Sequence, residues 1–336
     1  MEIAEIYKNK DNSVIKYVHH NGAETTVKFT NSCNFKFDDN ISLENPIEID
    51  RNKVVVFLSI SVGCRQRCKF CYLTLKNFPY HKLTDEEIIK NTIYAIESSG
   101  DLSDKYIKLS FMGMGDVLDS SSNDIFKITT EILIHCLQYD LIKGIDGIDI
   151  GTVFPKNTVD LISLKNSITL LNNWIRYGDL PLNPAQEYNI DYPFHSTHEK
   201  RTPVRLFISL HSTSDDVRSF LMPNSDNISR ILVNVYEFDI DVIFHYILLS
   251  DINDSKFQIR LLADIFSKGI LKDFELRVLR YNKCNGSIFN ESHRFKEIIK
   301  YLSLQNIKLK YQISTGSEIK AACGQFICHN TVGNDL

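Results

Sequence analysis

The stretch VVVFLSISVGCRQRCKFC, residues 54–71, joins a continuous apolar run to a short segment that holds three cysteines. The run from 54 to 62 carries no charge and is rich in β-branched residues, so it predicts a strand buried on both faces of a parallel sheet. Cys64, Cys68 and Cys71 follow directly, and we expect them on a loop at the carboxyl end of that strand. Ligands bind at this edge of the sheet in parallel α/β folds.

Strand-like apolar runs alternate with helix-like segments along the chain. Thr84 and Glu87 form a capping-box pattern that predicts a helix over 83–100, with Gly100 just past its end, and 123–142 also reads as helical. Further strands are expected at 106–115, 145–155, 204–212, 241–249, 274–282 and 307–315. This alternation predicts a parallel sheet, either barrel-like or doubly wound. We favour an α/β fold built as a partial (β/α)6 TIM-like barrel with a small N-terminal β extension.

Two stretches do not follow the alternation. Residues 1–53 lack a strong helix pattern, and VIKYVHHNGAETTVKF (14–29) predicts a β-hairpin around Asn21-Gly22. We therefore expect an N-terminal β-hairpin extension at 1–53 and a core barrel at 54–330. Residues 156–203 are an expected insertion between two strands, which is either a lid or interaction surface or a tolerated loop excursion.

The composition limits the class of protein. The chain has 336 residues, of which 43% are hydrophobic, so it can bury a sizeable core. It holds no run of about 18 apolar residues, and MEIAEIYKNK at its start is charged where a signal peptide is apolar. We expect a cytoplasmic protein with no membrane partner. The net charge of −4 argues against a generally basic surface, although a local basic groove for nucleic acid is compatible with it.

The chain has eight cysteines, and clustered cysteines in a cytosolic protein indicate metal binding or catalysis more often than disulfides. Thiolates are the ligands of iron–sulfur clusters. A four-iron cube needs four ligands, so three cysteines leave one iron open to a substrate or cofactor, as in catalytic metal sites. A structural zinc site, with a distant Cys or His as fourth ligand, is the alternative.

The spacing Cys-x3-Cys-x2-Cys, with Phe70 before the last cysteine, resembles the radical-SAM motif. In that superfamily the open iron is chelated by S-adenosylmethionine, whose reductive cleavage gives a 5′-deoxyadenosyl radical. A narrower set of motifs resembles the RlmN/Cfr-type radical-SAM RNA methyltransferases in order and approximate spacing, over about residues 54–328: FMGMGD (111–116), ISLHS (208–212), LMPNS (221–225), LRYN (279–282) and AACGQF (321–326). The piece NGAETTVKF (21–29) also resembles the strand that precedes the family's core.

The resemblance implies methylation of an adenosine ring carbon in ribosomal or transfer RNA, with a 4Fe-4S cluster, S-adenosyl-L-methionine, and a reductant such as flavodoxin or ferredoxin. It assigns the cluster to Cys64, Cys68 and Cys71. It assigns S-adenosylmethionine to Gly115 and Asp116 at its amino end, and to Ser209, Leu210, His211 and Asn282 at its ribose and adenine. It makes Cys323 the methyl carrier and places Glu24 near the substrate base.

The chemistry of these residue types agrees with the implied roles. A glycine at a strand end permits close approach of the backbone to a ligand, and a carboxylate such as that of Asp116 accepts hydrogen bonds from an ammonium group. An amidine ring carbon is not nucleophilic, whereas the thiolate of Cys323 can accept a methyl group by displacement. Ordinary turn and cap chemistry is the alternative for the glycine and serine motifs, a small buried cysteine for Cys323, and a solvated hairpin carboxylate for Glu24.

Four features depart from the family pattern. Phe57 stands where the family has a second, resolving cysteine, and Cys33, Cys284 and Cys328 are candidates to replace it. Asp116 stands where the family has glutamate, Asp149 lies near the position of a serine, and no N-terminal helical RNA-binding domain is expected in the residues before Cys64. Two alternatives therefore stay open, namely a radical-SAM enzyme with a different substrate and a non-catalytic iron–sulfur or zinc protein such as a redox sensor.

Overall fold

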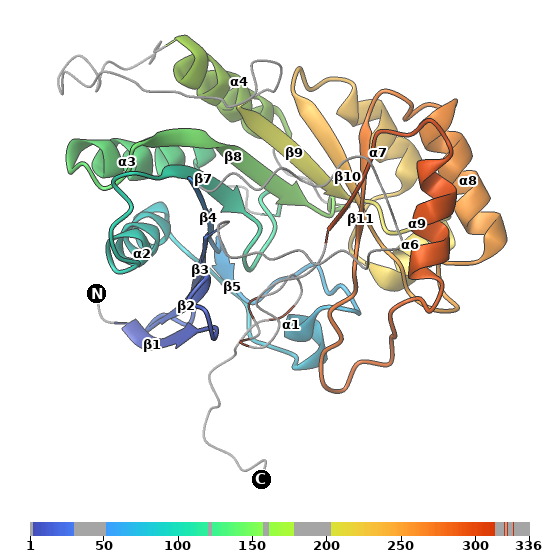
Figure 1. The fold of residues 1–336 in the computed structure, drawn as a ribbon, viewed down its shortest axis with the longest axis horizontal. Coiled ribbons are helices and arrows are strands. Elements are labelled where there is room, and N and C mark those ends of the chain that lie inside the picture. The colour runs from blue at the N-terminus through green and yellow to red at the C-terminus, as the bar shows by residue number, and fades with distance from the viewer. Residues whose placement is uncertain are drawn as a thin grey trace.

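The computed structural model describes residues 3–29, 52–119, 123–156, 161–177 and 203–312, together with the single positions 319, 321 and 325. These residues form one ten-stranded sheet whose strands follow the order β1-β2-β3-β4-β7-β8-β9-β10-β11-β12. Their bounds are β1 Ile3–Lys8, β2 Val14–His19, β3 Glu24–Phe29, β4 Lys53–Phe57, β7 Tyr106–Phe111, β8 Gly144–Thr152, β9 Val204–Ser209, β10 Asp241–Ile247, β11 Glu275–Leu279 and β12 Leu309–Gln312. Figure 1 shows them fanning across the molecule in chain order.

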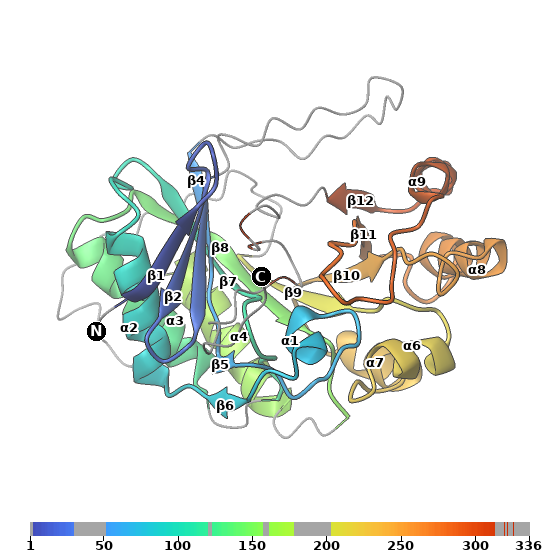
Figure 2. The ribbon, with the colours of Figure 1, turned by 90° about the horizontal axis from the view of Figure 1, so that it is seen from below.

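The strand order decides between the two architectures that the sequence allowed. Every neighbouring pair from β4 to β12 is parallel, and the order never reverses, whereas a doubly wound sheet reverses at a switch point. β1 and β12 are the edges of the described sheet, so it stays open (Figure 2). The partial-barrel prediction is therefore confirmed, and β12 supplies a seventh parallel strand.

The N-terminal hairpin is present as predicted and extends the same sheet. β2 and β3 pair antiparallel across a turn in which Gly22 has a φ of +85°, a conformation that glycine adopts without strain. β1 pairs with β2, and β3 pairs antiparallel with β4, so the extension joins the barrel directly at β4.

The expected single strand over 54–62 is wrong. β4 ends at Phe57, and the chain then turns so that β5 (Ser61–Val62) pairs with β6 (His81–Lys82) in a separate two-stranded sheet. In the segment between β4 and β5, the Leu58 amide donates to the Ser110 carbonyl of β7. The Ile60 amide donates to the Met114 carbonyl in the loop after β7. Most of the run is buried, with Val55 and Phe57 half-buried, but its second half has different hydrogen-bonding partners.

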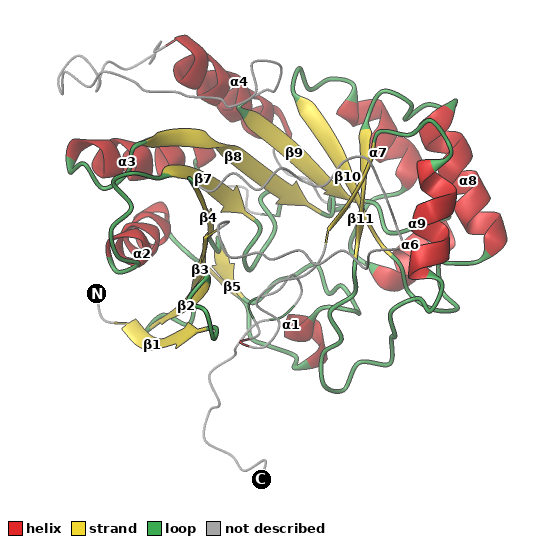
Figure 3. Ribbon diagram, viewed as in Figure 1, coloured by secondary structure: helices red, strands yellow, loops and turns green. Residues whose placement is uncertain are grey.

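Helices cover one face of the sheet and join successive parallel strands (Figure 3). They are α1 Tyr72–Leu75, α2 Asp85–Glu97, α3 Ile125–Gln138, α4 Leu161–Tyr177, α6 Asp215–Leu221, α7 Ile228–Val235, α8 Lys256–Ser267 and α9 Phe295–Ser303. The predicted capping box is confirmed, because Thr84 and Glu87 satisfy each other's backbone amides at the start of α2. No described helix is long and apolar enough to span a membrane.

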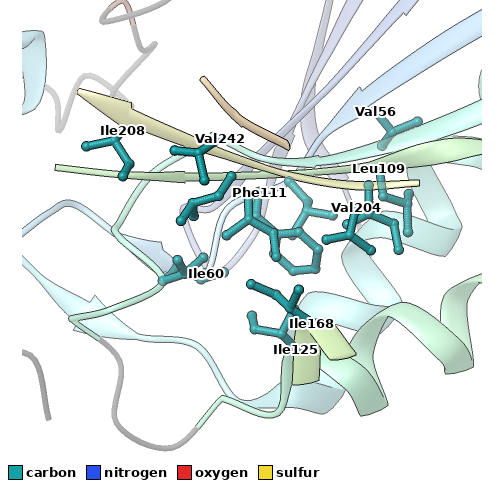
Figure 4. Close-up of a cluster of buried hydrophobic side chains, with 14 of the residues drawn as sticks. Val56, Ile60, Leu109, Phe111, Ile125, Ile168, Val204, Ile208 and Val242 are labelled. Carbon is teal, nitrogen blue, oxygen red and sulfur yellow. The ribbon is translucent and has the colours of Figure 1, made fainter. Parts of the chain in front are cut away.

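The main core lies between the sheet and these helices. Val56 of β4, Leu109 of β7 and Val204 of β9 share this core with Ile125 of α3 and Ile168 of α4 (Figure 4). Helix α4 occupies part of the expected insertion at 156–203 and connects β8 to β9, with Trp174 fully buried. Residues 178–202 lie outside the described part of the chain.

Candidate functional site

The three cysteines lie on a tight loop between β5 and α1. Gly63 opens the loop with a φ of +68°, and a Cβ there would lie 2.4 Å from the carbonyl oxygen of Pro79, so no larger residue fits. The Cys71 amide donates to the Cys68 carbonyl at 3.0 Å, and Cys71 is the N-cap residue of α1. The loop is therefore fixed by its own turn and by the β5–β6 sheet behind it.

The environment of the thiols fits a site for a positively charged inorganic group. Cys68 is buried, while Cys64 and Cys71 are half-buried. Burial raises the pKa of the Cys64 thiol to about 12. Burial, with Cys64 and Cys71 close by, raises the pKa of Cys68 well above its ordinary value. These thiols stay protonated at neutral pH unless metal charge compensates their ionisation.

The donor set fits a cluster better than a single ion. Among the described residues, no group of three or more His, Cys, Asp or Glu side chains is arranged to hold one metal ion. The three thiols nevertheless share one loop and influence each other electrostatically. Thiolates are the ligands of iron–sulfur clusters, and Cys64, Cys68 and Cys71 are the residues that would hold one.

The structure brings the cysteine loop against motifs that lie far along the chain. The Phe70 ring packs edge-on against His211, with centroids 5.2 Å apart, and the Lys69 amide donates to the Leu221 carbonyl at 2.9 Å. Cys68 belongs to a second buried cluster with Leu221, Met222, Leu279, Tyr281 and Phe289. The cysteine, SLHS, LMPNS and LRYN motifs therefore meet at one rim of the barrel.

The GMGD motif lies at the same rim, packed against the segment between β4 and β6. Gly115 has a φ of +97°, and a Cβ there would lie 2.4 Å from Ser61 Oγ. The amide of Met114 donates to Ser59 Oγ at 3.0 Å, and Ser59 Oγ in turn donates to the Glu24 carbonyl at 2.6 Å. This chain of bonds links the N-terminal hairpin to the loop expected to meet the cofactor.

Asp116 is more deeply engaged with the protein than the sequence indicated. Its Oδ1 accepts from Leu118 N and Thr152 Oγ1, and its Oδ2 accepts from Val153 N at 2.6 Å. Burial raises the pKa of Asp116 to about 6, although these hydrogen bonds oppose the shift. The carboxylate therefore holds the end of β8 in place. Oδ2 accepts one of these bonds and has a second lone pair, which can accept from a donor such as an ammonium group.

The SLHS motif presents backbone and ring surfaces rather than free polar side chains. The Leu210 side chain lies in the main core, and its amide donates to the His245 carbonyl at 2.9 Å. His211 has a φ of +53°, a conformation that costs energy for a non-glycine residue and marks functional loops. Burial holds the pKa of His211 well below its ordinary value, and its Nδ1 accepts from the Ile247 amide at 3.2 Å. Ser209 and Asn282 are half-buried at the same rim.

Arg218 is a residue of the site that the sequence analysis missed. It is 1% exposed, and its guanidinium donates to the carbonyls of Asp226, Ser209, Leu210 and Val153 at 2.5 to 2.9 Å. It therefore ties together the ends of β8 and β9 and the start of α7. Its sequence signal was that it is the one cation of α6, whose other residues are acidic, apolar or, at Ser219, neutral and polar.

Two departures from the family pattern lie on the other face of the sheet, away from the helices. Arg205 binds Asp149 through both carboxylate oxygens at 2.7 and 2.8 Å. Burial alone would raise the pKa of Asp149, but Arg205 and Lys108 hold it below its ordinary value. Phe57 pairs with Thr26 and Ser110 in the adjoining strands. Asp149 is therefore committed to an ion pair within the sheet.

Glu24 is not a solvated hairpin carboxylate. It is 3% exposed and forms an ion pair with Lys16 at 2.6 Å, and Lys16 is itself buried. That alternative is wrong, because the hairpin packs as part of the ten-stranded sheet. Cys284 is a buried thiol in the loop after β11. Cys323, Cys33 and Cys328 lie outside the described residues.

Comparisons with known proteins agree with the motifs. No family model matches the chain. It is 27% identical over 289 residues to a Dual-specificity RNA methyltransferase RlmN of Wolinella succinogenes, covering 82% of this chain and 67% of that protein. It is 26% identical over 333 residues to a Probable dual-specificity RNA methyltransferase RlmN of Clostridium botulinum, covering 96% and 78%. The fold matches a radical SAM methyltransferase from Sphaerobacter thermophilus with a TM-score of 0.64 at 20% identity, over 96% of this chain and 80% of that one.

Proposed function

We propose that this chain, a relative of the RlmN/Cfr-type radical-SAM methyltransferases, transfers a methyl group to a ring carbon of adenosine in ribosomal or transfer RNA. The observation that carries the proposal is the meeting of the cysteine loop with the SLHS motif through Phe70 and His211. These motifs are about 140 residues apart in the sequence, and their contact builds one site at the rim where a parallel barrel binds its ligands.

The cofactors are a 4Fe-4S cluster and S-adenosyl-L-methionine, which together supply an electron and a carbon-centred radical when bound. Cys64, Cys68 and Cys71 hold the cluster. The backbone at Gly115 and the free lone pair of Asp116 receive the amino end of S-adenosylmethionine. Ser209, the backbone of Leu210, the wall formed by His211, and Asn282 bound its ribose and adenine.

Cys323 carries the methyl group in this proposal. When bound, S-adenosylmethionine would supply a methyl group that the Cys323 thiolate can accept by displacement, with S-adenosylhomocysteine as the leaving group. Glu24, which forms a buried ion pair with Lys16, lies near the RNA base in this proposal. A small one-electron donor protein, such as flavodoxin or ferredoxin, completes the set of partners.

Anaerobic reconstitution tests the proposal. The wild-type protein is expected to gain the visible absorbance of an iron–sulfur cluster and to form 5′-deoxyadenosine when dithionite and S-adenosylmethionine are added. The Cys64→Ala/Cys68→Ala/Cys71→Ala variant is expected to lose both, whereas Cys136→Ala, at a buried cysteine of α3, retains both. Peptide mass spectrometry is expected to find a methyl group on Cys323. A protein that binds zinc alone would refute the proposal.

A second function is favoured by one observation. Phe57 occupies a strand position where the resemblance calls for a thiol, and a phenyl ring can neither take a proton nor form a disulfide. A radical-SAM enzyme of the same scaffold with a different substrate fits this residue. Formation of 5′-deoxyadenosine together with an unmethylated Cys323 would support this second function over the first.

A further inference from the structure

The segment that carries the three cysteines also carries an excess of positive charge. From residue 51 to residue 84 there is no Asp or Glu, while the same stretch holds Arg51, Lys53, Arg65, Arg67, Lys69, Lys76 and Lys82. The chain as a whole has a net charge of −4. Five of these cations, from Arg65 to Lys82, lie on the cluster loop, at the end of α1 or on β6, whereas Lys53 begins β4 and forms an ion pair with Asp146.

Three of these cations form what we call the basic face, namely Arg67, Lys69 and Lys76, and all three are exposed. Neutral groups hold each of them. Arg67 donates to Asn77 Oδ1 at 2.7 Å, Lys69 lies 3.9 Å from the centre of the Phe220 ring, and Lys76 lies 5.9 Å from that of Tyr72. Within the described residues, no carboxylate forms an ion pair with the basic face, so its charge is available to a partner.

Neighbouring elements continue the same surface. The Phe220 ring packs edge-on against Phe289 at 6.2 Å, and beside Phe289 the exposed Lys283 donates to Asn290 Oδ1 at 2.7 Å. Figure 1 shows this loop after β11 alongside α1. Arg65, 54% exposed, lies at the other side and forms an ion pair with Asp119. The cationic surface thus spans the cluster loop, α1 and the β11 loop.

Two members of the basic face, Arg67 and Lys69, lie on the loop that carries the three cysteines. Arg67 and Lys69 flank Cys68 in the sequence, so their Cα atoms lie about 3.8 Å from the Cα of a cluster ligand. The Cys68 side chain itself is buried in the group of apolar side chains that includes Leu221 and Met222. Asp116 and His211, which the proposed function assigns to S-adenosylmethionine, are buried, whereas the basic face is exposed. A partner on the basic face would therefore contact the solvent side of the cluster loop.

We propose that the basic face docks an acidic electron-transfer protein that reduces the cluster, an inference that rests on the proposed function. One electron passes from a reduced flavin or iron–sulfur group of the donor to the cluster held by Cys64, Cys68 and Cys71. The donor is oxidised by one electron, the cluster is reduced by one, and no covalent bond changes at the interface. Charge complementarity of this kind steers association and suits the small, transient interfaces of redox partners.

The test replaces Arg67, Lys69 and Lys76 by glutamine in one variant and by glutamate in another. A matched control replaces Lys256, Lys272 and Lys300 by glutamate, because these lysines are also exposed but lie on α8, the loop after it and α9. Each protein is reconstituted, and 5′-deoxyadenosine formation is measured with two electron sources. One is flavodoxin kept reduced by its NADPH-dependent reductase, and the other is dithionite, which needs no docking surface.

With flavodoxin at low salt, we expect kcat/KM for the donor to fall several-fold in the glutamine variant and at least about tenfold in the glutamate variant. The dithionite rate and the affinity for RNA stay at the wild-type values, and the control variant keeps all three. Raising the salt concentration slows the wild-type reaction with flavodoxin and leaves the glutamate variant almost unchanged.

Three results would overturn the inference. An equal loss with dithionite would mean that the face supports the cluster itself. Weaker RNA binding with unchanged flavodoxin kinetics would mean that the face docks RNA. Unchanged kinetics in both variants would mean that it docks neither. A wild-type protein that forms no 5′-deoxyadenosine with dithionite would instead refute the proposed function, so the two failures are distinguishable.

Discussion

Replacing Arg218 by methionine tests whether one buried cation holds the rim of the barrel together. The guanidinium donates to four carbonyls from three segments, at the ends of β8 and β9 and at the start of α7. Burial lowers its pKa to about 10, so it is still protonated at neutral pH. Methionine fills a similar volume but leaves four buried carbonyls without this donor.

The magnitude follows from opposing contributions. Each hydrogen bond from a charged group is worth about 1.5–3 kcal/mol, but the variant also recovers the cost of burying a cation, which is several kcal/mol. We expect a net loss of about 3–5 kcal/mol in the free energy of unfolding, as is typical when one partner of a buried charged network is removed. For 336 residues the entropy of unfolding is about 0.7 kcal/mol/K, so the Tm should fall by about 5 °C.

The assay is thermal unfolding of the metal-free protein, followed by titration of S-adenosylmethionine into the reconstituted protein. Arg218→Lys keeps the charge but cannot reach all four carbonyls, so its loss should be intermediate. Arg260→Met removes an exposed arginine of α8 and is the matched control. If Arg218→Met melts within about 1 °C of this control and binds S-adenosylmethionine equally well, the guanidinium does not position the rim.

Three further predictions use other parts of the structure. Burial lowers the pKa of His19 to about 4, below its unfolded value, so His19 stabilises the fold above about pH 6.5 and this contribution is lost as the pH falls toward 4. In urea unfolding, the free energy of unfolding should fall by about 3 kcal/mol less over that pH range in His19→Gln than in wild type. Parallel plots of unfolding free energy against pH for the two proteins would contradict this. Arg205→Met should lower the free energy of unfolding by about 3–5 kcal/mol, because it leaves Asp149 buried without its ion-pair partner. Adding Asp149→Asn to this variant should restore most of the lost stability. Additive losses in the double-mutant cycle would refute the coupling between the two residues. Gly115→Ala should lower the Tm and abolish S-adenosylmethionine binding, because its Cβ would lie 2.4 Å from Ser61 Oγ. The control Gly286→Ala has a φ of +88° and nothing within 4 Å of its Cβ, so it should show only the milder cost of that φ. Equal effects of the two substitutions would show that space at Gly115 is not limiting.

Local patterns in the sequence predicted the elements whose stability is local. The capping box of Thr84 and Glu87, the Asn21-Gly22 turn and the apolar strands all depend on side chains within a few residues of one another. The three cysteines could be placed on one loop after a strand for the same reason, while their role as cluster ligands stays a prediction. The expected single strand over 54–62 was wrong. Its apolar sequence indicates burial, but burial does not determine which strand each half of the run pairs with.

The residues that depend on distant partners could not be predicted in this way. Arg218 resembles any charged residue of a short helix until the fold encloses it among carbonyls from three segments. Glu24 and Asp149 were identified by position, but their buried ion pairs with Lys16 and Arg205 exist only in the assembled sheet. The sequence by itself determined the strand and helix alternation and the spacing of the three cysteines on one loop, because periodicity and spacing are local properties. Only the tertiary structure decided the strand order, the contact between the cysteine loop and His211, and the state of each buried charge, because these depend on which distant segments share a low-dielectric interior.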